Sequence, residues 1–339
     1  MSARWPVREK ILNRHVAWWV AAVVVAGVLA ALPFFGEKFT VQFVTRVLIM
    51  AIFAMSLNLL VGFTGLVSLG HAAFFGVAGY CLALASPQYQ AASLWTSLPL
   101  AMLASGLLAL VIGLLVLRTS GVYFIMATLA FAQMVYFVFH DSGIAGGSDG
   151  IYIYARPDAS ILGWRPLDLE KFADLHFLVL ALFLLAFGFI RLLRDSLFGR
   201  VIAGIRVNEH RMRSLGFATF RYKLACFVVA GMIAGLAGYL AAVQYGVVNP
   251  EMLGWHLSGT VLMMVILGGM GTLTGPVIGT AVMLLLEMVL QSLPDIGGIS
   301  PGRHWQLPMG IVIVLVALFL PRGLAGLLAR RRAPVADHD

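Results

Sequence analysis

The chain has 339 residues, of which 61% are hydrophobic and only 11% are charged, and its formal net charge is +8. Soluble domains carry charged residues at about a quarter of their positions, so this composition excludes an ordinary soluble protein. Most of the positive charge clusters beside apolar runs, which is typical of membrane topology signals and argues against a nucleic-acid-binding protein.

Apolar segments that approach the length needed to cross a bilayer, about twenty residues, follow one another along the chain. Ten such segments can be argued, at residues 16–35, 39–61, 66–86, 94–117, 121–140, 174–193, 223–245, 257–271, 275–293 and 306–321. They predict an all-α integral membrane protein, a polytopic bundle of about ten transmembrane helices within the domain 16–321.

Two glycine-rich stretches interrupt this pattern. Residues 62–79 contain five glycines and a histidine, and residues 268–276 (GGMGTLTGP) form a very short connection between two apolar segments. Non-helical backbone at membrane depth is tolerated where it is buried in protein or lines a cavity. We therefore expect broken or re-entrant helices at both stretches.

Charge placement orients the spans. Residues 1–15, 194–222 and 322–339 are rich in basic side chains, whereas across 141–174 six acidic side chains outnumber three basic ones. Because basic loops are retained in the cytoplasm, we expect a cytoplasmic N-terminus, a cytoplasmic 194–222 segment and a basic, polar cytoplasmic tail. The 141–173 loop then lies on the opposite side. The first apolar segment has the length of a full span and no convincing cleavage site, which favours an uncleaved anchor.

Few polar side chains lie at membrane depth, and they are Arg46, Asn58, His71, Gln133, His140 and Glu287. Arg46 and His140 lie near span ends and are expected to snorkel toward the membrane surface. His71 follows a glycine-rich break, where its ring can face a central cavity. Glu287, twelve residues into its segment, has no partner evident from the sequence, so it either lines a water-filled path or pairs with a neighbouring subunit.

The most basic part of the chain is 191–223, which contains eight basic and two acidic side chains and therefore has a net charge of +6. Ser196 or Asp195 can cap the start of a helix here, and Gly216 can end it. Apolar side chains share one face of that helix at 100° per residue: Phe198, Val201, Ile202, Ile205, Met212 and Leu215.

Two interpretations of this amphipathic helix remain open. It lies on the membrane surface with its apolar face down, or it acts as a lever that docks into a groove of a separate cytoplasmic partner. Within it, Arg206 and Glu209 are three residues apart and are expected to form an intrahelical ion pair worth about 0.2–0.5 kcal/mol.

The sequence contains neither a phosphate-binding motif nor a helical zinc-binding motif. No lysine stands in a Gly-Lys-Ser/Thr motif, so a phosphate-binding P-loop is absent, and none of the eight histidines forms an HExxH or HxxxH pair. Cys81 and Cys226 fall inside apolar runs far apart in the sequence and are expected to be small buried residues. We therefore expect no enzyme activity, no cofactor and no metal site.

Four segments together resemble one family. The run LNLLVGFTGLVSLGHAAFFGVAGY (57–80) is similar to the signature of branched-chain amino-acid ABC importer permeases, specifically the LivM-like subunit. GGSDGI (146–151), FGRVIAGIRVNEHRMRSLGF (198–217) and VILGGMGTLTGPVIG (265–279) resemble further segments of that family in the same order. Two mild departures, Ala203–Gly204 in place of a frequent arginine and a reversed glycine–alanine order at 78–79, concern only details of the coupling surface.

The resemblance implies a permease subunit of a heteromeric importer in the bacterial inner membrane, with leucine, isoleucine or valine, or related amides, urea or small organic acids, as the solute. Its implied partners are the lipid bilayer, a second permease, two cytoplasmic ATP-binding subunits and a periplasmic solute-binding protein that contacts the loops 141–174 and 246–256.

The resemblance also favours the lever interpretation. It implies that the residues coupling to the ATPases are Gly199, Arg200, Ile205, Arg206, Asn208, Glu209, Leu215 and Gly216. Candidates for lining the translocation path are Asn58, Ser68, His71 and Glu287. The alternative function is a single-chain secondary transporter or channel, in which Glu287 is the one credible ion-coupling carboxylate.

Overall fold

The computed structural model describes residues 24–86, 91–160, 167–293, 301–320 and 323–330. Within these ranges, five helices are long and apolar enough to cross a membrane, and five shorter apolar helices accompany them. The long helices are α2 (Lys38–Asn58) with the π-helix η1 (Leu59–Thr64) that continues it, α4 (Leu94–Val116), α5 (Val122–His140), α6 (Phe172–Asp195) and α9 (Thr219–Tyr245). The shorter ones are Val24–Phe35, α3 (His71–Ala85), α10 (Trp255–Gly268), α11 (Gly275–Gln291) and α12 (Gln306–Phe319).

Each of the ten predicted apolar segments overlaps one of these helices, the first (16–35) in its described part from residue 24, so the prediction of a helical membrane bundle is confirmed. The count of ten crossings stays a prediction, because five of the helices are shorter than a span. The expected cytoplasmic N-terminus 1–15 and the end of the tail, 331–339, lie outside the described residues. The first part of the tail forms α13 (Gly323–Arg330).

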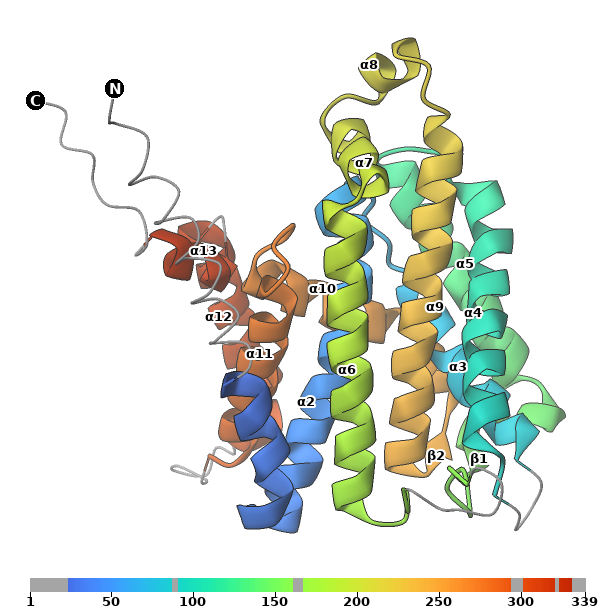
Figure 1. Ribbon diagram of the computed structural model, residues 1–339, viewed down its shortest axis with the longest axis vertical. Coiled ribbons are helices and arrows are strands. Elements are labelled where there is room, and N and C mark those ends of the chain that lie inside the picture. The colour runs from blue at the N-terminus through green and yellow to red at the C-terminus, as the bar shows by residue number, and fades with distance from the viewer. Residues whose placement is uncertain (1–23, 87–90, 161–166, 294–300, 321–322, 331–339) are drawn as a thin grey trace, which may run out of the picture.

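Two helices form the centre of the bundle. In the most apolar stretches of α2–η1 and α9, 89% and 83% of the residues are buried, against 17% in α5. Glycines let α9 approach its neighbours closely, between α6 and α4 in Figure 1. A Cβ atom at Gly231 would lie 2.5 Å from the Cβ of Ala109 on α4, and one at Gly238 would overlap the carbonyl oxygen of Phe75 on α3. The core therefore depends on the small residues of α9.

Both predicted helix breaks are present. The π-helix η1 ends at Gly65, where φ is 75°, and the chain stays non-helical until α3 begins at His71. The second break follows α10, with φ values of 113° at Gly269 and 78° at Gly271, and ends where α11 begins at Gly275. These positive φ values explain why glycine occupies the breaks, since other residues rarely adopt them.

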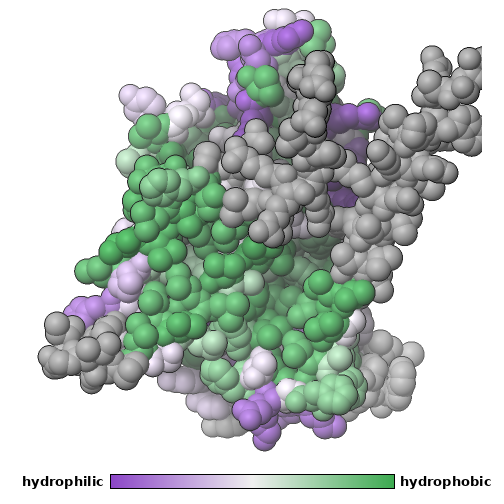
Figure 2. Space-filling model, turned by 90° about the vertical axis from the view of Figure 1, so that its left-hand side faces the viewer, coloured by the Kyte–Doolittle hydropathy of each residue, from purple (hydrophilic) through white to green (hydrophobic). Residues whose placement is uncertain are grey.

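The two ends of the bundle differ. At one end stand α7 (Leu197–Val207) and α8 (Glu209–Ser214); at the other, β1 (Ile151–Tyr152) pairs antiparallel with β2 (Val247–Val248) (Figure 1). The short helices η2 (Gly143–Ala145), η3 (Gly147–Asp149), η4 (Pro250–Leu253) and η5 (Pro301–His304) lie in connections. Figure 2 shows hydrophobic side chains across the middle of one face and hydrophilic ones gathered at its ends. This arrangement suits a protein that crosses a bilayer, with the basic segment and the outer loop at opposite ends.

Candidate functional site

The basic segment forms two helices where the sequence predicted one. Ser196 caps α7 as expected, because its Oγ accepts a hydrogen bond from the backbone N–H of Gly199 at 3.3 Å, and Gly216 follows α8 with a φ of 86°. The prediction of a continuous helix between them was wrong. Asn208 has extended backbone angles (φ −156°, ψ 100°), and its Oδ1 accepts a hydrogen bond from the N–H of Arg211 at 2.9 Å. Asparagine at this position ends one helix and caps the next.

The break also divides the predicted apolar face. Ile202 and Ile205 on α7 are buried within the chain, whereas Leu215, after α8, is 64% exposed, so these apolar side chains do not form one continuous face. The two helices fold against each other where Met212 packs on Gly204, and a Cβ atom at Gly204 would lie 2.8 Å from the Met212 sulfur. The pair is therefore one compact unit, which we call the α7–α8 unit (residues 197–214).

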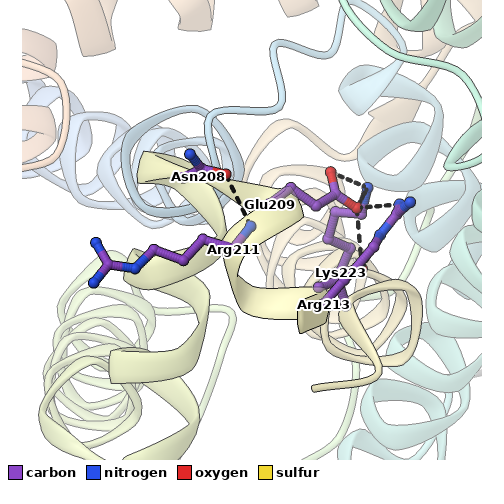
Figure 3. Close-up of polar contacts among 6 residues, drawn as sticks. Asn208, Glu209, Arg211, Arg213 and Lys223 are labelled. Carbon is purple, nitrogen blue, oxygen red and sulfur yellow. Dashed lines mark hydrogen bonds and ion pairs between the residues drawn. The ribbon is translucent and has the colours of Figure 1, made fainter. Parts of the chain in front are cut away.

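Glu209 is the centre of a polar cluster that joins α8 to α9 (Figure 3). Its carboxylate accepts hydrogen bonds from Arg213 Nη2 at 2.6 Å, from Thr219 Oγ1 at 3.0 Å and from Lys223 Nζ at 3.1 Å. Partial burial acts to raise the pKa of Glu209, but the hydrogen bonds from Lys223 and Arg213 outweigh it and hold that pKa below its usual range. The cluster fixes the α7–α8 unit to the first turns of the central helix α9.

The predicted ion pair between Arg206 and Glu209 was wrong, because each has a different partner. Arg206 Nη1 donates to the carbonyl oxygen of Gly62 in the π-helix. The break at Asn208 separates Arg206 from Glu209, so the helical spacing of three residues no longer applies. The i+4 partner Arg213 follows the ordinary spacing rule and was missed.

Arg206 and Asn58 meet at a point that we call the junction (Asn58, Gly62, Arg206, Gly271 and Thr272). The Asn58 amide donates to the carbonyl of Thr272 and accepts from the N–H of Gly271, both at 2.9 Å. A Cβ atom at Gly62 would lie 2.5 Å from the Gly271 nitrogen, and one at Gly271 would lie 3.1 Å from Arg206 Nη1. The junction therefore ties α7 to both helix breaks at once, using close backbone contact that only glycine permits.

Two of the predicted path residues lie inside the subunit. Ser68 and His71 are fully buried. His71 Nε2 is 2.8 Å from Ser56 Oγ, and its ring stacks on Phe53 with 5.5 Å between centroids. These contacts are typical of core packing rather than of a residue that faces an open cavity. A role for either residue in the path stays a prediction.

Glu287 has a partner within the same chain. Its Oε1 is 3.6 Å from Nη2 of Arg46 on α2 and accepts a hydrogen bond from Gln291 Nε2 at 3.3 Å. Arg46 therefore has a partner on α11 that the sequence did not reveal, and its snorkelling toward the membrane surface stays a prediction. His140, by contrast, sits at the end of α5 with its Nδ1 2.9 Å from Asp141 Oδ1.

A shallow groove, open to its surroundings, follows the exposed side of α5. It is lined by Leu129, Ala130, Gln133, Met134, Phe137, Val138, Asp141 and Ser142. Among the described residues, no group of three or more His, Cys, Asp or Glu side chains is placed to hold a metal ion.

Comparisons with known proteins agree on one family. The model of the family described as branched-chain amino acid transport system / permease component matches residues 39–317. The chain is 30% identical to the high-affinity branched-chain amino acid transport system permease protein LivM of Salmonella typhimurium, over 88% of this chain and 72% of the relative. It is also 30% identical to LivM of Escherichia coli, over 90% and 73%.

A shorter match concerns a different solute. The L-arabinose ABC transporter permease protein AraH of Azospirillum brasilense is 29% identical over 39% of either chain. No solved structure matches the chain.

Proposed function

The chain belongs to the family of permease components of branched-chain amino acid transport systems, and from this premise we propose that it forms half of the translocation path of an ATP-binding-cassette importer. The observation that carries the proposal is the α7–α8 unit, which stands at one end of the bundle and is bonded both to α9 and to the junction. A permease driven by separate ATPases needs a part that reaches out of the membrane and connects back to the helices of the path.

The exposed surface of the α7–α8 unit fits a protein partner. Arg200, His210 and Arg211 are exposed, and Figure 3 shows Arg211 extending away from the Glu209 cluster. Val207 of this unit is 86% exposed, and Leu215, which directly follows the unit, is 64% exposed. A basic surface with protruding apolar side chains suits a groove lined by acidic and apolar residues. This supports docking to an ATP-binding subunit over the alternative of a helix lying on the membrane.

Arg206 gives the docked unit a connection to the membrane helices. It leaves α7 and bonds to Gly62, next to the Asn58 contacts with the α10–α11 connection. Movement of the α7–α8 unit therefore acts directly on both helix breaks, where the regular backbone hydrogen bonding of the helices is interrupted. Breaks of this kind, including π-helical turns, are frequent at functional sites.

The remaining partners follow from the same proposal. A second permease covers the groove on α5, which is the least buried of the five long helices. The β1–β2 pairing joins the outer loop 141–173 to the 246–256 loop and gives a periplasmic solute-binding protein one continuous surface. The solute is a branched-chain amino acid, as for the LivM relatives, or a small solute of similar size, and the assembly lies in the bacterial inner membrane.

The second candidate, a secondary transporter or channel, has less support. Ion coupling needs a carboxylate that binds a lone cation, and Arg46, 3.6 Å from Glu287, disfavours this because its positive charge already balances that carboxylate. An isolated chain that takes up solute without ATP would nevertheless establish it.

Two charge-reversal variants test the proposal. One tests whether the α7–α8 unit docks to the ATP-binding subunits, and the other tests whether Arg206 couples that unit to the helix breaks. The chain is produced with its ATP-binding, permease and solute-binding partners, and co-purification, ATP hydrolysis and leucine uptake into proteoliposomes are measured. We expect Arg211→Glu to reduce co-purification of the ATP-binding subunits, because reversing an interfacial charge costs about 2–5 kcal/mol, more than tenfold in affinity.

Arg206→Glu is expected to keep co-purification and abolish ATP-driven uptake, because the connection to Gly62 is lost. Arg118→Glu, an exposed arginine at the end of α4, is the control and should behave as wild type. Normal uptake by Arg206→Glu at matched membrane levels would contradict the coupling role.

A further inference from the structure

Three helices that are far apart in the sequence bring ionisable side chains together at membrane depth. Arg46 of α2 lies 3.6 Å from Glu287 of α11, and Tyr245, the last residue of α9, lies within electrostatic range of both charges. One turn away, Gln244 Nε2 donates to the carbonyl oxygen of Gln42 at 2.9 Å and holds α9 against α2. The cluster of Arg46, Tyr245 and Glu287 therefore joins the two central helices, α2 and α9, to α11, and a separate contact fixes α9 against α2.

The cluster lies inside the bundle's apolar zone, toward the β1–β2 end. Arg46 is eight residues inside the start of α2, about 12 Å along the helix axis, and Glu287 is four residues, about 6 Å, from the end of α11. Tyr245 is separated from β2 by a single residue. Charged side chains at such depth usually face a water-filled path or each other, because lipid solvates them poorly.

The side chains of Arg46 and Glu287 are partly exposed, and their charged groups do not approach to hydrogen-bond distance. The Arg46 side chain is 42% exposed and that of Glu287 is 18% exposed. Their separation of 3.6 Å exceeds the 2.7–2.9 Å, roughly, of a charge-assisted hydrogen bond. Arg46 Nε is buried and has no hydrogen-bond partner among the described residues. The terminal N–H groups of the guanidinium, held only at 3.6 Å from Glu287, remain able to bind a carboxylate through parallel hydrogen bonds.

We propose that Arg46 and Glu287 form a binding site for the zwitterionic head group of an α-amino acid in transit, with Arg46 holding the carboxylate and Glu287 the ammonium group. The site rests on the proposed importer function and deepens it by naming the feature of the solute that is recognised. A zwitterion offers one charge of each sign, as the pair does, so its binding leaves the site neutral. An uncharged solute such as urea would gain much less from the same two side chains.

Transport and ATP hydrolysis by the complete transporter in proteoliposomes test the site. The probes are radiolabelled leucine, which is zwitterionic, and urea, which is uncharged. We expect Arg46→Gln and Glu287→Gln each to lower leucine uptake per ATP hydrolysed by about tenfold or more, the scale of losing one partner of a charge pair. Hydrolysis stimulated by the loaded solute-binding protein stays normal, because the α7–α8 unit is untouched. Arg118→Gln is the matched control.

Other outcomes overturn the inference in distinct ways. If the pair only ties α2 to α11, uptake and ATP hydrolysis fall together with the melting temperature of the complex, and the double exchange Arg46→Glu with Glu287→Arg restores all three. If wild-type transporter carries urea and not leucine, the head-group site is wrong while the importer function stands. If wild type moves leucine without ATP, the importer function itself fails.

Discussion

Among the described residues, Glu209 and Glu287 are both paired with cations, and they are paired very differently. Glu209, in the α7–α8 unit, accepts hydrogen bonds from Arg213, Thr219 and Lys223 at 2.6–3.1 Å. Glu287, at membrane depth, has one amide contact at 3.3 Å and a guanidinium at 3.6 Å. A carboxylate whose acceptor sites are filled holds helices together, whereas one with unfilled sites can bind something that comes and goes. The first arrangement suits a rigid lever and the second a site on a path.

The largest fall in stability is expected when the buried partner of Glu209, Lys223, is replaced. Lys223 is 7% exposed, so Lys223→Met keeps most of the side-chain volume and leaves the carboxylate short of a donor. We expect the free energy of unfolding of the purified assembly to fall by about 2–3 kcal/mol, the scale for a hydrogen bond to a charged group. The measurement is thermal melting in detergent. Lys171→Met, which removes a cation 70% exposed and 3.7 Å from Asp168, is the control and should change little.

Acid should weaken the same cluster by a smaller amount, since Lys223 and Arg213 stay in place. The pKa of Glu209 is held below its ordinary value of 4.5 by the hydrogen bonds from Lys223 and Arg213, against the opposing effect of burial. A lowered pKa means that the stabilisation is complete above the unfolded value and is lost as the pH falls through the folded value. We expect the melting temperature of wild type to drop more steeply below about pH 4.5 than that of Glu209→Gln, which has no carboxyl to titrate. Parallel curves for the two proteins would show that Glu209 is not the titrating group.

The outer cation of the cluster should matter less than the inner one. The Arg213 side chain is 58% exposed, and it pairs with Glu209 at the i+4 position on the same short helix. Such pairs contribute about 0.3–0.5 kcal/mol. Arg213→Ala should therefore lower the melting temperature only slightly, and the effect should shrink in high salt because exposed charges are screened. If Arg213→Ala lowered the melting temperature as much as Lys223→Met does, burial would not explain how much each cation contributes to stability.

The sequence predicted the features that depend on local pattern. Apolar length placed the ten helical segments, glycine clusters placed both helix breaks, and the cap at Ser196 and the stop at Gly216 were confirmed. Each of these depends on residues within a few positions of one another, so a single chain carries enough information to find them.

Features that depend on contacts between distant elements were missed. Arg46 and Glu287 are separated by 241 residues, and no local pattern fixes which side of α2 meets α11. The junction was likewise hidden, because the close approach of Gly62 to Gly271 depends on how two breaks pack. The interruption at Asn208 was missed for another reason, since asparagine is tolerated inside helices and caps them when the tertiary contacts favour a turn.

The smallest expected change in stability is for substitution of Glu287. The size of that change shows whether the Arg46–Glu287 pair is exposed to lipid or to a water-filled path. Glu287→Gln keeps the side-chain shape and leaves Arg46 without an anionic partner. If that face of α2 met lipid, an unpaired guanidinium at this depth would cost at least about 2.5–3.5 kcal/mol. On a water-filled path the Arg46 side chain, which is 42% exposed, can keep its terminal nitrogens hydrated, and the change should be no more than a few tenths of a kcal/mol, as for exposed pairs. We expect unchanged thermal melting together with the loss of leucine uptake, a combination opposite to that of Lys223→Met. A marked fall in the melting temperature of Glu287→Gln would assign both glutamates the same structural role and remove the difference between the two regions.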